Sequence, residues 1–467
     1  YKKSPKEAAL SWFKDARFGL FVHWGPASLY GQGEWVMYNN RIPIKEYEQK
    51  AREFKGGKFN AQDYVNLALD ANMKYITFVI KHHDGFALWD SKASDYNSVK
   101  YPSGRDFLKE LSIACKRAGL GLFIYYSVGL DWHHPYYIPN TMYDPARPHY
   151  AKTPEEYKYS KPEDFKHYMN FAKTQIMELC TMYGPIAGFW FDTVGGVYQY
   201  SDLFNIQEVY DMIHAIQPHA LVVFKTGANG NEDFITGERH FGSLAPVFKS
   251  VGLPKKVQDA ADYSWQNNKA KPAELNIPIQ TLGWAYHSSS KQRQKSAKEV
   301  MDLLDYCAKV NANLLLNIGP RPDGSILEEN VRVLKEVGRK LKKEGFPAFC
   351  CRKSFSFLFF KNTAIHPPQT VRRTVLRGGG SCPVWRSNTI FRRSVSILLR
   401  RSRLRQCNIS ARCRLHSGAG SGKPIRFWPI GLRLRYRTSS PHRFWSKWRL
   451  PALPFFRRIW ISGRDHH

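Results

Sequence analysis

Short apolar runs alternate with amphipathic segments along the first part of this chain, and this alternation constrains its fold more than any other feature. Strands are predicted at 18–22, 75–80, 119–126, 186–191, 220–225, 278–286 and 312–318. Helices are predicted at 61–73, 105–118, 163–183, 203–216, 297–310 and 328–343. This order predicts an α/β fold with a parallel sheet and right-handed crossovers. It favours a closed, somewhat irregular (β/α)8 TIM barrel over an open doubly wound sheet, and no Gly-rich phosphate loop opens a helix.

The positive charge of the chain is concentrated in its last part. Of 70 lysines and arginines, 26 fall in residues 349–467, where Asp465 is the one acidic residue. This leaves 44 basic and 38 acidic residues in 1–348, so the net charge of +31 does not describe that part. We therefore predict two segments, a catalytic barrel at 1–348 and a basic Arg-rich segment at 349–467.

Residues 349–467 show no sustained helical or strand period, and three interpretations compete. The segment could be a basic arm that binds nucleic acid, in which case its deletion would remove that binding without affecting catalysis. It could be a small disulfide-rich module, but its five cysteines are an odd number. We favour a frameshifted or non-native segment, because a functional basic arm is usually richer in Lys and poorer in Trp and Phe. No nucleic-acid partner is therefore expected.

Few features of residues 1–348 bear on the compartment. Cys115, Cys180 and Cys307 lie on apolar helix faces and are predicted to be packing residues without disulfides. No stretch is long and apolar enough for a transmembrane helix. The chain starts at Tyr1 without Met or a hydrophobic signal region, which indicates a processed or trimmed product.

Asp192 follows an apolar run, 186–191, that is typical of a buried parallel strand. Its position is where a strand gives way to a loop, and in a (β/α)8 barrel that rim carries the chemistry. An Asp that caps the following helix is the alternative interpretation, and taken alone the two are nearly balanced.

Other predicted strands end in a similar polar and aromatic way. His23 follows the first strand, His82 and His83 follow the second, and Tyr126 ends the third. Trp190 lies just before Asp192, and the loop after the first strand adds Glu34 and Trp35. Aromatic rings stack on the apolar face of a sugar, while His and Glu bind its hydroxyls, so these residues predict a sugar pocket.

A zinc site is the main rival interpretation for His23, His82 and His83. Adjacent histidines point to opposite sides if a strand continues through them, and no HExxH pattern occurs. We therefore expect no metal.

Four motifs together resemble the α-L-fucosidases of glycoside hydrolase family 29, and the resemblance covers about residues 5–347. The motifs are RFGLFVHWG at 17–25, KHHDGF at 81–86, WFD at 190–192 and LLLNIGP at 314–320. The resemblance implies a retaining, exo-acting hydrolase of terminal α-L-fucose on oligosaccharides or glycoconjugates, with no metal and no organic cofactor. It also implies periplasmic or secreted placement. A β-sandwich usually follows the barrel in this family, and the Arg-rich segment stands in its place here.

The resemblance also implies roles for individual residues. Asp192 is expected to be the nucleophile, and the residues expected to line the fucose pocket are His23, Glu34, Trp35, His82, His83, Tyr126 and Trp190. One branch of the family has its acid/base in a segment similar to 233–240, which selects Glu238, with Glu232 and Asp233 as nearby competitors. That branch often carries an Arg after the fifth strand, where this chain has Lys225 and Thr226.

Two other functions remain open at this point. One is a retaining exo-glycosidase for a related sugar such as galactose, and the other is a catalytically inactive sugar-binding barrel. The sequence leaves the linkage, the aglycone preference and the oligomeric state open.

Overall fold

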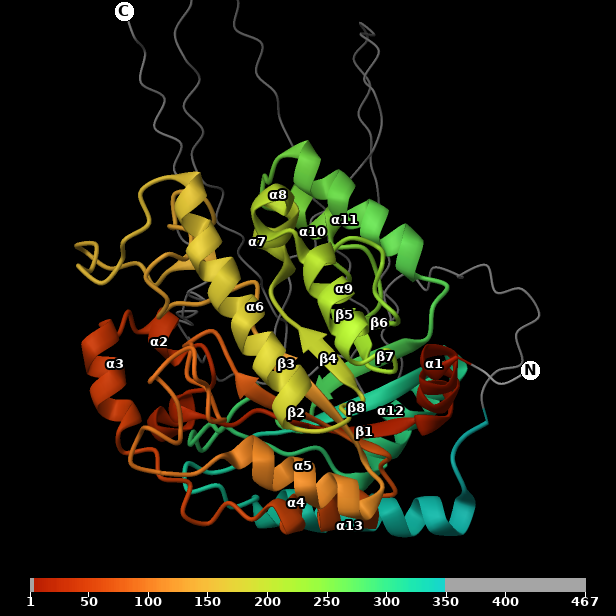
Figure 1. The fold of residues 1–467 in the computed structure, drawn as a ribbon. Coiled ribbons are helices and arrows are strands. Elements are labelled where there is room, and N and C mark those ends of the chain that lie inside the picture. Colours follow the sequence, from red (N-terminus) through yellow and green to blue (C-terminus); the bar gives the residue numbers. More distant parts are fainter. Residues whose placement is uncertain (1–3, 349–467) are drawn as a thin grey trace, which may run out of the picture. The chain divides into compact units, whose positions relative to one another are not determined.

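The structure, a computed structural model, describes residues 4–348, and eight parallel strands form its centre (Figure 1). The strands are β1 Phe18–Val22, β2 Tyr75–Lys81, β3 Gly121–Tyr126, β4 Gly188–Phe191, β5 Leu221–Phe224, β6 Ile235–Glu238, β7 Ala273–Pro278 and β8 Ala312–Ile318. Their order in the sheet is β5-β4-β3-β2-β1-β8-β7-β6. Since β1 pairs in parallel with both β2 and β8, the two halves join as they do in a (β/α)8 barrel.

The barrel closes between β5 and β6 through a much weaker contact. These two strands share one isolated parallel bridge, Lys225 to Thr236, and the amide of Thr226 donates to the carbonyl of Thr236 over 3.1 Å. We call this place the β5–β6 seam. The architecture is therefore a nearly closed barrel, and the predicted fold class is confirmed.

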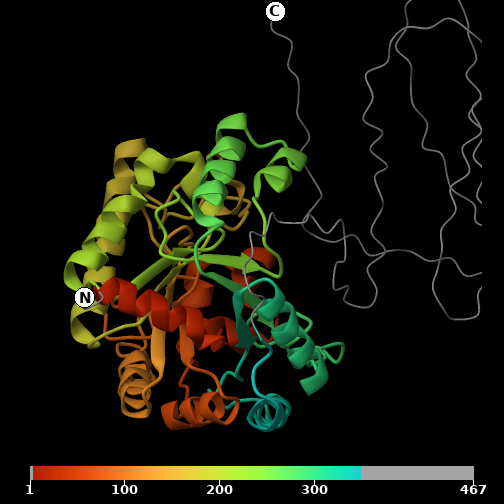
Figure 2. The same ribbon diagram turned by 90° about the vertical axis from the view of Figure 1, so that its right-hand side faces the viewer.

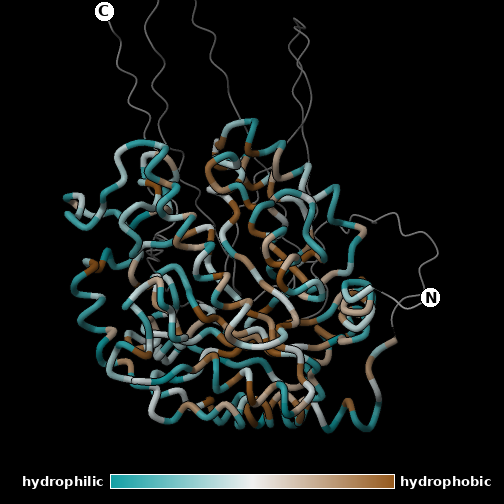
Figure 3. The backbone as a smooth tube through the Cα atoms, viewed as in Figure 1, coloured by the Kyte–Doolittle hydropathy of each residue, from teal (hydrophilic) through white to brown (hydrophobic). Residues whose placement is uncertain are grey.

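Helices surround the strands. They are α1 Pro5–Ala16, α2 Val36–Asn39, α3 Ile44–Ala51, α4 Ala61–Asp70, α5 Phe107–Ala118, α6 Phe165–Met182, α7 Val194–Gln199, α8 Ser201–Phe204, α9 Ile206–Ile216, α10 Ala245–Ser250, α11 Lys255–Asn268, α12 Ala297–Lys309 and α13 Glu328–Glu344. The six predicted segments correspond to α4, α5, α6, α9, α12 and α13, and the other helices were not predicted. Short 3-10 turns occupy Pro26–Tyr30, Asp144–Ala146 and Pro162–Asp164. Hydrophilic and hydrophobic residues alternate along the helices (Figure 3), as expected for helices that pack one face against the strands.

Two of the strand predictions need correction. The run 278–286 is not a strand, because β7 ends at Pro278 and the residues beyond it form a loop. Strand β6 was not predicted at all, since Ile-Thr-Gly-Glu is short and polar. Strand β7 is also unusual, because it carries buried Glu274 and Asn276. A search for apolar runs misses such strands, because they carry polar groups that are buried and hydrogen-bonded inside the protein.

Side chains alternate between two separate apolar layers along each strand, as the pleat requires. Phe21, Phe123 and Tyr125 belong to a cluster inside the barrel, whereas Ile124 and Tyr126 belong to the larger cluster between strands and helices. The inner layer is aromatic and leaves room for chemistry at one end of the barrel only.

Helix α1 crosses the other end of the barrel (Figure 2). Its Phe13 is fully buried and packs on Phe234, Tyr75 and Phe123. The backbone carbonyl of Phe13 accepts a hydrogen bond from the Asn313 side chain over 2.7 Å. The amino-terminal end of the barrel is thus plugged, which leaves the carboxyl ends of the strands for a site.

Three remaining predictions concern composition. Cys115, Cys180 and Cys307 are buried and free, as predicted. Within residues 4–348, no helix is long and apolar enough to cross a membrane. The predicted segment 349–467 lies outside the described residues, so its interpretation stays a prediction.

Gly338 of α13 allows a close helix contact that holds the last helix against α4. A Cβ built at this position would lie 1.7 Å from the carbonyl oxygen of Asp70, which is backbone and cannot swing away. We expect Gly338→Ala to lower the free energy of unfolding by about 2 kcal/mol, because a clash costing about 3 outweighs a helix-propensity gain of about 1. Chemical denaturation measures this. The exposed neighbour Arg339→Ala is the control, and a more stable Gly338→Ala protein would contradict the prediction.

Candidate active site

Asp192 lies one residue past the end of β4 and is almost completely buried. Its Oδ2 accepts a hydrogen bond from the Tyr125 hydroxyl over 2.7 Å, and its Oδ1 accepts one from the backbone amide of Thr193. The ammonium of Lys225 lies 2.8 Å from the same Oδ1. Such a carboxylate is held in one orientation by groups from three neighbouring strand ends.

Lys225 joins Asp192 to a second carboxylate. It follows β5, and its Nζ lies 2.8 Å from Asp192 and 3.1 Å from Oε2 of Glu238, the last residue of β6. The two carboxylate oxygens are consequently within about 6 Å of each other, since both contact one nitrogen atom. Retaining glycosidases place their two carboxyl groups about 5–5.5 Å apart, and inverting ones about 6.5–9.5 Å.

The charges of this group stabilise one another. Burial alone would raise the pKa of Asp192, but the Lys225 ammonium and the hydrogen bonds from Lys225 and Tyr125 hold it below its usual value. Burial works against the charge of Lys225, yet Asp192 and Glu238 raise the pKa of the ammonium well above its ordinary value. Asp192 is therefore ionised at neutral pH, as a nucleophile must be.

The two competitors of Glu238 have structural roles elsewhere. Glu232 is buried, and its carboxylate accepts hydrogen bonds from the Tyr210 hydroxyl, the Asn268 amide and three backbone amides of its own loop. Asp233 pairs with Lys6 of α1 and His214 of α9, toward the plugged end of the barrel. Of the three carboxylates, Glu238 is the one brought beside Asp192.

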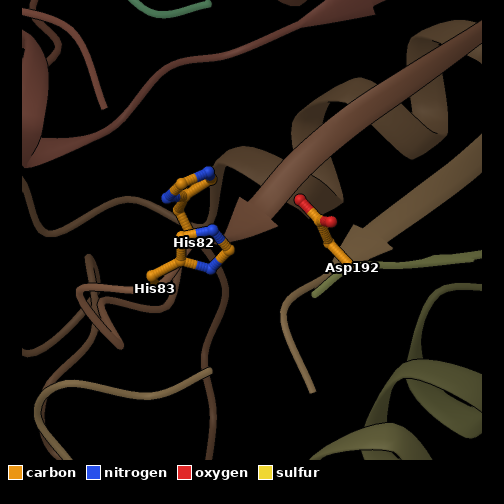
Figure 4. A group of neighbouring side chains, drawn as sticks. All are labelled: His82, His83 and Asp192. Atoms are coloured by element: carbon orange, nitrogen blue, oxygen red, sulfur yellow. The ribbon is translucent and has the colours of Figure 1, made fainter. Parts of the chain in front are cut away.

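His82 and His83 lie on the same side of the site, against the expectation that they point apart (Figure 4). Their ring centroids are 3.9 Å apart. Strand β2 ends at Lys81 after a register irregularity between Val79 and Lys81, and Gly85 then closes a turn on the carbonyl of His82. The alternation of a strand no longer applies past Lys81, so both imidazoles can face Asp192.

Each of these histidines is uncharged at neutral pH, since burial lowers both pKa values well below the usual one. His83 Nδ1 is 2.7 Å from the hydroxyl of Ser127, which fixes its ring. His82 stacks parallel to Tyr125, and its buried Nδ1 has no hydrogen-bond partner in the part of the chain that the structure describes. A buried polar atom without a partner marks a position for a ligand.

His23 and Glu34 line the opposite side of the site. His23 Nδ1 lies 2.6 Å from the side-chain oxygen of Asn317 in β8, and burial lowers the pKa of the imidazole to about 4. Glu34 accepts hydrogen bonds from the backbone amides of Trp284 and Ala285, while burial raises the pKa of its carboxyl. A small recess beside them is lined by His23, Glu34 and His82 together with apolar side chains, and neither Asp192 nor Glu238 lines it.

Aromatic rings complete the walls. The Trp35 ring packs edge-on against His83 and Trp132, and Trp284 packs against His23 at 5.3 Å between centroids. Trp190 is buried beneath Asp192, where it stacks on Tyr125 and donates its ring N–H to Glu274. Trp190 therefore forms the floor of the site. Burial raises the pKa of the Glu274 carboxyl, which accepts this hydrogen bond, to about 7.

Tyr126 is the one expected pocket residue that the structure places elsewhere. Its hydroxyl donates to Gln175 of α6 over 2.7 Å, in the layer between strands and helices. The preceding residue, Tyr125, faces the barrel interior and contacts Asp192. The strand end was recognised correctly, but the choice of face was one residue out of register.

The sequence interpretation also missed Tyr125, Trp284 and Asn317, and noted Lys225 without giving it a role. Asn317 stands in the LLLNIGP motif, so a polar residue in an apolar strand could have indicated it. Trp284 was hidden because its loop was read as part of a strand. Lys225 follows the apolar run of β5 in the same way that Asp192 follows β4, and this parallel was the available signal.

The group closest to a metal-ligand arrangement consists of His82, His83 and Asp192, whose ligand atoms lie within 4.8 Å of one another. His23 is not part of it. The Asp192 carboxylate is already bonded to Lys225 and Tyr125, and a cation there would meet the Lys225 ammonium. The residues fit a metal poorly for this reason.

The backbone turns unusually directly after three residues of the site. Thr193, Thr226 and Arg239 follow Asp192, Lys225 and Glu238, and their φ angles are +71°, +64° and +63°. These lie in the left-handed region, which β-branched residues such as Thr rarely adopt. Strain of this kind costs roughly 1–3 kcal/mol per residue and gathers at functional sites.

Comparison with known proteins agrees with this geometry. The sequence model described as Alpha-L-fucosidase matches residues 2–346. The chain belongs to the α-L-fucosidase family. The chain is similar to α-L-fucosidase 1 of Arabidopsis thaliana, with 28% identity over 363 residues that cover 75% of this chain and 62% of the relative.

Two solved fucosidases have similar folds. α-L-Fucosidase isoenzyme 1 from Paenibacillus thiaminolyticus is 30% identical, with a TM-score of 0.59 over 73% of this chain and 77% of that one. AlfC from Lactobacillus casei, solved with its α-L-fucose product, is 26% identical, with a TM-score of 0.56 over 72% of this chain and 99% of that one. This chain spans less than two thirds of the Arabidopsis relative and of a Caenorhabditis elegans relative.

Replacing Lys225 tests its electrostatic role in this fucosidase-family site. We expect Lys225→Met to move the acidic limb of the kcat/KM profile upward by about 1–3 pH units, the usual effect of an opposite charge on an Asp. The limb is expected to move to higher pH because Lys225 lowers the pKa of Asp192, and Asp192 must be ionised to act.

Lys225→Arg is the matched control, since it keeps a cation and is expected to keep the limb near its wild-type position. The limb is read from the pH dependence of kcat/KM on a chromogenic α-L-fucoside. An unchanged limb in a folded Lys225→Met protein would rule out the electrostatic role.

Removal of metals is expected to leave activity intact, because Lys225 already neutralises the carboxylate that a metal would need. Prolonged dialysis against a chelator, followed by the same fucoside assay, measures this. Loss of activity that zinc restores would contradict the arrangement described for Asp192.

Proposed function

We propose that this chain is a retaining exo-α-L-fucosidase, and the observation that carries the proposal is the single ammonium of Lys225 in contact with both Asp192 and Glu238. This contact brings one oxygen of each carboxylate to within 5.9 Å of the other, the sum of the 2.8 and 3.1 Å contacts, which is compatible with the separation of about 5–5.5 Å that a double displacement uses. Support for fucose as the substrate comes from family membership and from the AlfC structure, which contains α-L-fucose.

In the first step, Asp192 attacks the anomeric carbon as the glycosidic C–O bond breaks. Glu238 donates its proton to the leaving oxygen, so the aglycone departs as an alcohol and a fucosyl ester forms on Asp192. Glu238, now ionised, takes a proton from water as that water attacks the same carbon, which releases fucose and frees Asp192. Glu238 is suited to this exchange because its side chain is one-third exposed and can reach water.

The pocket supplies directed polar groups for the sugar hydroxyls. His23, His82 and His83 are neutral imidazoles, each able to donate one hydrogen bond and accept one. The unpartnered Nδ1 of His82 is satisfied when a hydroxyl binds there. Trp35 and Trp284 offer aromatic surface for the apolar face of the ring.

The same residues bear on the two alternative functions. An inactive sugar-binding barrel would need no second carboxylate near the first, so the contact of Lys225 with both Asp192 and Glu238 favours an enzyme. A related sugar such as galactose remains an outcome of the assay. Periplasmic or secreted placement, with fucosylated glycans as substrates and no nucleic-acid partner, completes the proposal.

Removal of Asp192 is the direct test of the mechanism. We expect Asp192→Gly to lose turnover of an activated aryl α-L-fucoside, and added azide to restore it by occupying the vacated space. The product would be fucosyl azide of inverted anomeric configuration, which NMR identifies. Wild-type turnover by Asp192→Gly would end the assignment.

Replacement of Glu238 gives a different signature. Glu238→Gln is expected to slow hydrolysis of a fucosyl disaccharide by about 10²–10⁴-fold, and an aryl fucoside much less, because a good leaving group needs little protonation. Matching galactoside and glucoside substrates serve as controls for sugar selectivity. Equal losses on both fucosides would remove Glu238 as the general acid and return attention to other carboxylates.

A further inference from the structure

The loops after β6 and β7 carry two cations, Arg239 and Lys295, that form no salt bridge within residues 4–348. Arg239, directly after Glu238, is exposed and forms no salt bridge with any residue of 4–348. Lys295 is likewise without a salt bridge in that range, and its Nζ donates to the carbonyl of Pro278 at the end of β7. Both therefore lie on the same rim of the barrel as the acid/base.

Arg239 is held toward the pocket. Its guanidinium carbon lies 5.9 Å from the centre of the Trp284 ring, and that ring packs against His23 inside the site. Its backbone amide bonds to the carbonyl of Asn276 in β7, within the strained turn described above. The Arg239 guanidinium therefore lies at the edge of the site, beside Glu238 and near the Trp284 ring.

The nearby charged residues leave this local excess of positive charge in place. Arg293 is matched by Glu299 through two hydrogen bonds of 3.0 and 3.1 Å, so Glu299 is occupied. Burial and the charge of Arg239 lower the pKa of Lys295 to about 8, with a smaller contribution from Arg293, while the charge of Glu299 opposes them. At neutral pH Lys295 still carries its charge, and the two cations repel each other in the absence of an anion.

We propose that Arg239 and Lys295 form a subsite for an anionic substituent, a sulfate ester or a carboxylate, on the sugar that carries the fucose. This inference rests on the proposed function, because Glu238 protonates the leaving oxygen and the leaving sugar must therefore lie on its side of the pocket. Arg and Lys are the side chains that bind such oxyanions.

The test compares kcat/KM for three fucosyl disaccharides of the linkage that the enzyme cleaves best. One has a neutral aglycone, one the same aglycone with a sulfate ester, and one a uronic acid. At about 10 mM salt, where screening is weak, we expect an anionic aglycone to be preferred about three- to tenfold, mainly through KM. At about 150 mM salt the preference is expected to shrink, because Arg239 is exposed and Lys295 is only partly buried, so that salt screens both charges.

Variants locate the effect. Arg239→Gln and Lys295→Gln are each expected to reduce the ratio of anionic to neutral kcat/KM, and the double variant to bring it near one. Lys342→Gln, on the exposed end of α13, is the matched control and is expected to keep the ratio. The salt dependence of the wild-type enzyme tests the inference even if a variant fails to fold.

The outcomes are distinct. Preference for the sulfate alone, the uronic acid alone or both identifies which anion the subsite accepts. Hydrolysis of the neutral disaccharide with no anionic preference at low salt, or a ratio unchanged in the folded double variant, overturns the inference and leaves the proposed function standing. If no fucoside is hydrolysed, the proposed function fails and the inference falls with it.

Discussion

The ammonium of Lys225 is the interaction on which the site depends, because it joins the ends of β4, β5 and β6, and β5 and β6 have little backbone pairing of their own. Strand β5 meets β6 through a single bridge at Lys225, and the ion pair of Lys225 with Glu238 crosses that seam, whereas its pair with Asp192 joins β5 to the adjacent β4. Buried charges are stable when they are paired with good geometry. One side chain thus closes the barrel where its backbone pairing is weakest and sets the spacing of the two carboxylates.

A stack of rings gives this arrangement its orientation. Tyr125 lies between His82, at 5.7 Å and 3° between planes, and Trp190, at 5.4 Å and 22°. Its hydroxyl then reaches Asp192. Behind the stack, Lys81 pairs with Asp131 in the outer layer, which anchors the end of β2 just before the two histidines turn inward. The outer layer therefore holds the inner one in register.

The barrel and most of its site could be predicted from the sequence because long apolar strands and polar strand ends are local signals. The strands that escaped, β6 and β7, carry polar residues whose partners come from distant parts of the chain, as Glu274 does with Tyr75. Likewise, the choice between Tyr125 and Tyr126 depends on register, which adjacent aromatic residues do not reveal. The joint facing of His82 and His83 follows from a bulge, which has no signature in this stretch.

The residues with left-handed backbone conformation after Asp192, Lys225 and Glu238 also limit which substitutions the site can accept during evolution. The backbone at Thr193, Thr226 and Arg239 favours Gly, Asn or Asp. Most other substitutions at these three positions are therefore disfavoured by backbone strain, whatever their effect on catalysis. Drift at these positions consequently runs through few amino acids. New leaving-group specificities are more accessible through side chains on the β7–α12 loop, where no such filter acts at Lys295.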